Sequence, residues 1–82
     1  MNDREPLTGY GELVGIIEAL PTLVREKRRR LGLTLRQAEE QSGVGQTTLH
    51  RYENRETISL EGLIALLRWV GTPDPVQGGE AR

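Results

Sequence analysis

The stretch TLRQAEEQSGVGQTTLHRYENR, residues 34–55, contains the signals that decide the fold. Thr34 and Gln37 have the spacing of a capping box, in which a hydroxyl and an amide each bond a backbone N–H left free at a helix start. This pair predicts a short helix over 35–41. A second short helix is expected over 45–53, where apolar residues recur at helical spacing.

The turn between these two helices, Ser42-Gly43-Val44, is as informative as the helices themselves. A three- to four-residue turn that contains glycine crosses two helices steeply and leaves the second one protruding. We expect Val44, Leu49 and Tyr52 to face inward. The stretch therefore predicts a helix-turn-helix over 35–53.

The outward face of the second helix carries polar side chains of the types that read base edges in a DNA major groove. Glutamine can pair with adenine, threonine can contact the thymine methyl group, and arginine can pair with guanine. The alternative is that these are solvated positions on an ordinary surface helix, and the adjoining turn favours the DNA-reading interpretation. The candidate base-reading residues are Gln46, Thr47, His50 and Arg51.

The rest of the chain adds three more expected helices and two tails. Apolar residues predict a helix over 10–19, although three glycines weaken it. A break at Leu20-Pro21 then separates it from a basic helix that Gly32 ends. Ser59 is a good N-cap for a last helix that closes at Gly71. We thus predict an all-α, compact bundle of about five short helices in one domain, residues 10–71, with a flexible lead-in over 1–9 and a disordered C-terminal tail over 72–82.

Composition and charge narrow the function classes. The chain has 82 residues, 35% of them hydrophobic, and no cysteine, so a disulfide framework and a thiolate metal site are excluded. Its apolar stretches are too short for a membrane span. The net charge of −1 divides into −3 over residues 1–20, +4 over 21–55 and −2 over 56–82. The positive block coincides with the predicted helix-turn-helix, where it would attract a polyanion.

Residues 22–71 resemble the Cro/C1-type (XRE-type) helix-turn-helix domain of phage repressors, which has a lambda-repressor-like fold. The resemblance rests on VREKRRRLGLTLRQAEEQSGVGQTTLHRYEN and on SLEGLIALLRWVG after it. It implies that Gln46, Thr47 and Arg51 read bases with His50 beside them. It also implies that Arg36, Asn54 and Arg55 grip phosphates, and that Arg28 pairs with Glu53 to tie the first family helix to the reading helix.

Two departures from the family pattern carry structural expectations. Glu39 stands at a crowded position between the two short helices that usually holds alanine. Its carboxylate needs a partner, such as backbone N–H groups near the turn or an arginine, or else the two helices must splay slightly. Arg55 stands where glycine is common, so we expect Asn54 to adopt the left-handed conformation instead.

The resemblance implies a sequence-specific regulator that binds double-stranded DNA in the cytoplasm of a bacterial host cell, a small repressor or phage Cro-like protein. A domain this small buries little surface, so we expect a homodimer on a pseudo-palindromic operator. Trp69 can be read either as a packing residue or as part of the subunit interface. Candidate dimer contacts are Ile16, Ile17, Leu66, Trp69 and Val70.

The alternative function is a protein-interaction module, such as an antitoxin-like domain that grips a partner protein, which the acidic flanks and the apolar 13–20 segment motivate. No catalytic constellation, metal site, cofactor motif or small-molecule effector site is evident from the sequence. The sole histidine, His50, has no nearby nucleophile or second ligand. An enzyme is therefore not expected.

Overall fold

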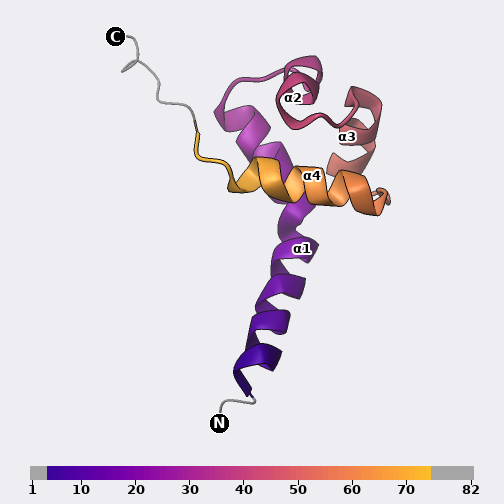
Figure 1. The fold of residues 1–82 in the computed structure, drawn as a ribbon. Helices are drawn as coiled ribbons and strands as arrows, with labels where there is room; N and C mark the ends of the chain where they lie inside the picture. The colour runs from indigo at the N-terminus through magenta and orange to yellow at the C-terminus, as the bar shows by residue number, and fades with distance from the viewer. Residues whose placement is uncertain (1–3, 75–82) are drawn as a thin grey trace.

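The computed structural model describes residues 4–74, which form four helices and no strand. They are α1 (Arg4–Arg30), α2 (Leu35–Ser42), α3 (Gln46–Glu53) and α4 (Leu60–Gly71). The C-terminal half of α1 packs with α3 and α4, and α2 packs with the same two helices. Helix α4 crosses α1 near its middle, and the N-terminal half of α1 projects away from the other helices (Figure 1). The described part is all-α, as predicted.

The prediction of five helices is wrong, because the two expected at 10–19 and after Pro21 are one continuous helix. Pro21 removes one backbone donor from the interior of α1. The helix nevertheless continues because Leu20, Val24 and Lys27 lie on one buried stripe that crosses the proline. Tertiary packing thus overrides the local break signal.

The predicted flexible lead-in over 1–9 is also wrong for residues 4–9, which are helical. Pro6 is compatible with this helix start because the first N–H groups of any helix have no partner within it. Residues 1–3 lie outside the described residues.

The predicted caps are confirmed. Thr34 Oγ1 accepts from the Gln37 N–H at 3.1 Å, and Gln37 Oε1 accepts from the Thr34 N–H at 2.9 Å. Ser59 Oγ accepts from the Gly62 N–H at 3.0 Å. Gly43 ends α2 with a left-handed φ of 82°, which glycine adopts without a steric penalty. These local bonds fix where α2 and α4 begin and where α2 ends.

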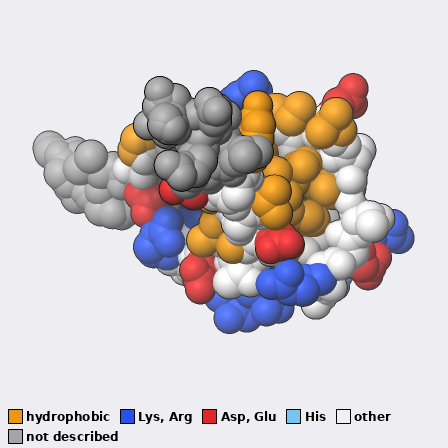
Figure 2. Space-filling model, turned by 90° about the horizontal axis from the view of Figure 1, so that it is seen from below, with side chains coloured by type: hydrophobic (Ala, Val, Ile, Leu, Met, Phe, Trp, Pro, Cys, Tyr) orange, Lys and Arg blue, Asp and Glu red, His pale blue; other side chains and the backbone are white. Residues whose placement is uncertain are grey.

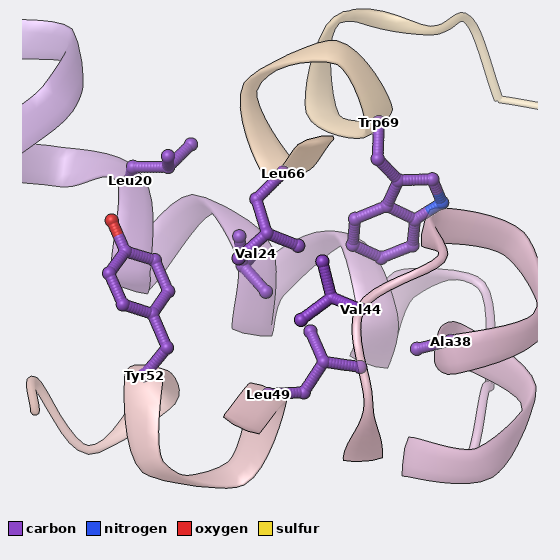
Figure 3. Packing of buried hydrophobic residues seen from close by; sticks show 8 residues of the cluster. All are labelled: Leu20, Val24, Ala38, Val44, Leu49, Tyr52, Leu66 and Trp69. Carbon is purple, nitrogen blue, oxygen red and sulfur yellow. The ribbon is translucent and has the colours of Figure 1, made fainter. Parts of the chain in front are cut away.

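The core is small and aliphatic and draws on all four helices and on the turn between α2 and α3. Val24, Val44, Leu49 and Leu66 meet at its centre, with Leu20 and Tyr52 toward one end and Ala38 and Trp69 toward the other (Figure 3). Leu20, Val24, Leu49 and Leu66 are fully buried. Val44 lies inside this core, so the turn itself is held by packing.

A buried lysine joins α1 to the end of α4. Lys27 Nζ donates to the carbonyl oxygens of Trp69 at 2.7 Å and Thr72 at 2.6 Å, and it lies 5.1 Å from the Trp69 ring centroid. These bonds satisfy carbonyls that a helix C-terminus leaves free.

The predicted disorder over 72–82 is wrong for its first residues, which bond to α1. Thr72 accepts from Lys27, and Asp74 forms two bonds to the Arg30 guanidinium, at 2.7 and 3.1 Å. The hydrogen bond from Arg30, with the positive charges of Arg30 and Lys27, holds the pKa of Asp74 below its ordinary value. The remainder of that predicted tail, residues 75–82, lies outside the described residues.

Candidate nucleic-acid interface

One side of helix α3 packs against the core, and the other side is exposed to solvent. Leu49 and Tyr52 are buried in the core, and Glu53 is buried beside them. The four predicted base-reading residues all lie on the exposed side of the helix: Gln46, Thr47, His50 and Arg51. Their spacing of i, i+1, i+4 and i+5 puts them on one face of α3.

The start of α3 is capped from α2. Gly45 precedes the helix and has no side chain to bond its free N–H groups. Glu39 fills this role, because its Oε1 accepts from the Gln46 N–H at 3.2 Å. A carboxylate at a helix N-terminus is stabilised by the helix dipole. The expectation that Glu39 finds backbone N–H groups near the turn is confirmed.

A polar hollow separates the exposed sides of α2 and α3. It has a volume of about 590 Å³ and is lined by Arg36, Glu39, Glu40, Gly43 and Gln46. The hollow brings Arg36, a predicted phosphate contact, close to Gln46, the first predicted base-reading residue. A positive and an amide side chain therefore stand at the same end of the exposed face of α3.

The end of α3 is tied to α1 by an ion pair. Arg28 donates to Glu53 through Nε at 2.7 Å and Nη2 at 2.9 Å, and through Nη1 to the Leu33 carbonyl at 3.1 Å. The Glu53 side chain is only 3% exposed. The hydrogen bond to Glu53 raises the pKa of Arg28 above its ordinary value. The structure thus brings together the two residues of the expected structural pair.

Arg25 also approaches this pair, which the sequence analysis did not anticipate. Its Nε lies 3.9 Å from Glu53 Oε1. Arg25 and Arg28 are three residues apart and so share one side of α1. That spacing, opposite an acidic residue expected to be buried, is the signal that could have identified the contact.

The two predicted phosphate contacts after α3 make bonds within the protein. Asn54 Nδ2 donates to the His50 carbonyl at 2.8 Å and so closes α3. Arg55 Nη2 donates to Thr22 Oγ1 at 3.1 Å, and its Nη1 donates to the Glu18 carbonyl at 3.4 Å. Both residues are exposed. The two bonds use two of the five N–H donors of the Arg55 guanidinium, so the others remain for a phosphate.

The expectation that Asn54 adopts the left-handed conformation is wrong. Arg55 has a φ of 67°, whereas Asn54 has a φ of −96°. A left-handed residue with a Cβ costs roughly 1–2 kcal/mol. Two backbone bonds that close the end of α3 accompany this conformation: the Arg55 N–H donates to the Tyr52 carbonyl at 2.9 Å, and the Glu56 N–H donates to the Arg51 carbonyl at 3.0 Å.

The candidate dimer residues fall into two groups. Leu66 and Trp69 are buried within the protomer, and Trp69 Nε1 donates to Gln41 Oε1 at 3.1 Å. Both are therefore packing residues within the protomer and are not available for a dimer contact. Ile16 is exposed, while Ile17 and Val70 are half-buried.

Within residues 4–74 no helix is long and apolar enough to cross a bilayer. The same residues contain no group of three or more histidine or acidic side chains that could hold a metal ion.

Comparison with known proteins adds one finding to this geometry. A family model described as a helix-turn-helix domain matches residues 19–77, well over half of the chain. The chain belongs to this helix-turn-helix family. Neither the curated proteins nor the solved structures that were searched gave a match. The domain match begins beside Leu20, where α1 becomes buried, so most of the projecting half of α1 precedes it.

Proposed function

We propose that this helix-turn-helix domain is a sequence-specific regulator that binds double-stranded DNA through the exposed face of α3. The observation that carries the proposal is that Gln46, Thr47, His50 and Arg51 share one exposed face of a helix whose other face is anchored. The anchors are the core, the Glu39 cap at its start and the Arg28–Glu53 pair at its end. A polar helix held this firmly suits the major groove, which is about 12 Å wide.

Each residue of the face has a defined role in the proposal. Arg51 pairs with guanine, Gln46 with adenine, and Thr47 contacts a thymine methyl group, with His50 between them. Arg36 holds a phosphate beside the end of α3 that carries Gln46. Asn54 and Arg55 are phosphate contacts that use the N–H donors not engaged in their internal bonds.

The finer form of the proposal is a small repressor, similar to the Cro/C1-type regulators of phages, that acts in the cytoplasm of a bacterial cell. One α3 offers few base contacts, so useful affinity requires two protomers on a pseudo-palindromic operator. The limited positive surplus, +4 over residues 21–55, supports the same conclusion because phosphate attraction alone would bind weakly.

Selection of binding sites from random DNA duplexes tests this proposal. We expect the full chain to enrich two inverted half-sites whose centres are about 10 base pairs, or one helical turn, apart. Binding to the enriched duplex should weaken as salt rises. Failure to enrich any motif, or equal binding to every duplex at all salt concentrations, would contradict the proposal.

A further inference from the structure

An apolar stripe runs along α1, and nothing in the described protomer covers its N-terminal end; we call residues 9–20, on which that end lies, the arm. A stripe of residues at alternating spacings of three and four runs along α1: Tyr10, Leu13, Ile17, Leu20, Val24 and Lys27. Its last three members are buried, whereas Tyr10 is 65% and Leu13 46% exposed. One continuous stripe is thus covered at one end and open at the other.

The exposed apolar side chains of the described residues are concentrated in two places. The large ones are Tyr10, Leu13, Val14 and Ile16 on the arm, and Leu60 and Ile64 on α4. Viewed from the N-terminal side of α1, hydrophobic side chains gather in one area of this face of the molecule (Figure 2). An apolar area of this kind marks an interaction surface.

The arm has little intrinsic helix stability. It continues the packed half of α1, but each interior glycine costs about 1 kcal/mol relative to alanine. The arm contains Gly9, Gly11 and Gly15, and a Cβ at any of them would meet nothing within 4 Å. No close packing in the protomer therefore requires these glycines or supports this helix.

We propose that the partner is a second copy of the chain, with the two arms packed antiparallel and the tip of each arm on Leu60 and Ile64 of the other protomer. This proposal deepens the dimer of the proposed function and rests on it for the link to DNA. The part of α1 before Pro21, residues 4–20, is only about 25 Å long. Arm-to-arm contact alone would cover less than the roughly 800 Å² per partner of a stable interface, so the apolar residues of α4 are needed to complete it.

Charge favours the antiparallel arrangement. The only charged residues of the arm are Glu12 and Glu18, whereas the body that an antiparallel arm would meet, residues 21–74 with α4 included, carries a net charge of +2. An antiparallel pair directs each acidic arm toward the basic body of its partner. A parallel pair would instead align acidic arm with acidic arm along their whole length.

Mass measurements in solution test the inference on three forms of the full chain: wild type, Y10Q/L13Q and A19Q. Tyr10 and Leu13 are exposed in the protomer, so their replacement leaves its core intact. Ala19 is an exposed arm residue outside the stripe and serves as the matched control. We expect wild type and A19Q to have twice the protomer mass at about 100 µM and Y10Q/L13Q to be monomeric. A monomeric wild type, or a dimeric Y10Q/L13Q, would overturn the arm contact.

Binding to a single half-site and to the complete operator separates this inference from the proposed function. We expect Y10Q/L13Q to bind a half-site duplex as wild type does and to lose at least about tenfold in affinity for the complete operator. If Y10Q/L13Q binds the complete operator as tightly as wild type, the inference fails and the proposed function stands. If wild type dimerises through the arm but binds no duplex selectively, the proposed function fails and the arm contact stands.

Discussion

At the scale of single residues, the position of α3 depends on a few polar contacts at its two ends. Glu39 caps the first turn in place of the missing Gly45 side chain, and the Arg28–Glu53 pair holds the last turn. The buried Glu53 carboxylate makes the second contact the more important one, because a buried charge that loses its partner is strongly destabilising.

Replacement of Arg28 by alanine should therefore destabilise the domain by about 3 kcal/mol, since Glu53 keeps its charge in a buried site with only Arg25 nearby. Arg29→Ala is the matched control, because Arg29 is the exposed neighbour on the same helix and should change stability by no more than about 0.5 kcal/mol. Urea unfolding of both variants gives the comparison. Equal stability of the two would show that the pair contributes nothing.

The burial of Tyr52 predicts that the domain becomes less stable at alkaline pH. Burial disfavours the phenolate and raises the pKa of Tyr52 above its ordinary 10.0, against the opposing effect of the Arg55 charge. Because the folded-state pKa is the higher one, the contribution of this group is complete below pH 10.0 and is lost as the pH rises through the folded-state value. The free energy of unfolding of wild type should thus fall more steeply above pH 10.0 than that of Tyr52→Phe. Parallel curves for the two proteins would refute this origin.

At the scale of elements, the sequence predicted those helices whose boundaries are set locally. Thr34 with Gln37, Gly43 and Ser59 act through bonds to residues a few positions away, so α2, the turn and α4 could be placed within a residue or two. The same reasoning found the exposed face of α3, because Val44, Leu49 and Tyr52 mark the opposite side by their spacing.

The features that could not be predicted depend on contacts between residues far apart in the chain. Pro21 indicates a break in the local sequence, and only the long-range packing of Leu20 and Val24 on either side of it keeps α1 continuous. Lys27 belongs to a basic run in which nothing in the sequence indicates burial, although its Nζ donates to carbonyls 42 and 45 residues away. Arg55 likewise adopts a left-handed conformation in a loop that is bonded to α1.

Lys27 gives a prediction for α4 as an element. Lys27→Met keeps most of the length of the side chain but removes both bonds to the end of α4 and the 3.8 Å ion pair with Asp74, so we expect a loss of about 2 kcal/mol. Amide hydrogen exchange should show the largest increase in the last turn of α4. Glu26→Gln, an exposed change next to it, should leave this exchange unaltered. An even increase across all four helices would contradict a local role for Lys27.

At the scale of the whole molecule, the chain combines a small helix-turn-helix body with a projecting arm. The longest dimension of 48 Å reflects α1, which is about 40 Å long on its own. The body holds the exposed face of α3 and most of the positive charge, and the arm carries the open apolar stripe. In this account the body recognises DNA, and the arm brings two bodies together on one operator.

A comparison of two arginine variants tests whether the exposed face of α3 reads bases, as we propose. Binding of Arg51→Ala and Arg29→Ala would be measured on the selected operator and on a scrambled duplex at one salt concentration. Both variants remove one positive charge, but only Arg51 lies on the exposed face of α3. We expect Arg51→Ala to lose about 1–3 kcal/mol on the operator and little more than Arg29→Ala does on the scrambled duplex. Equal losses for the two variants on both duplexes would contradict the proposal.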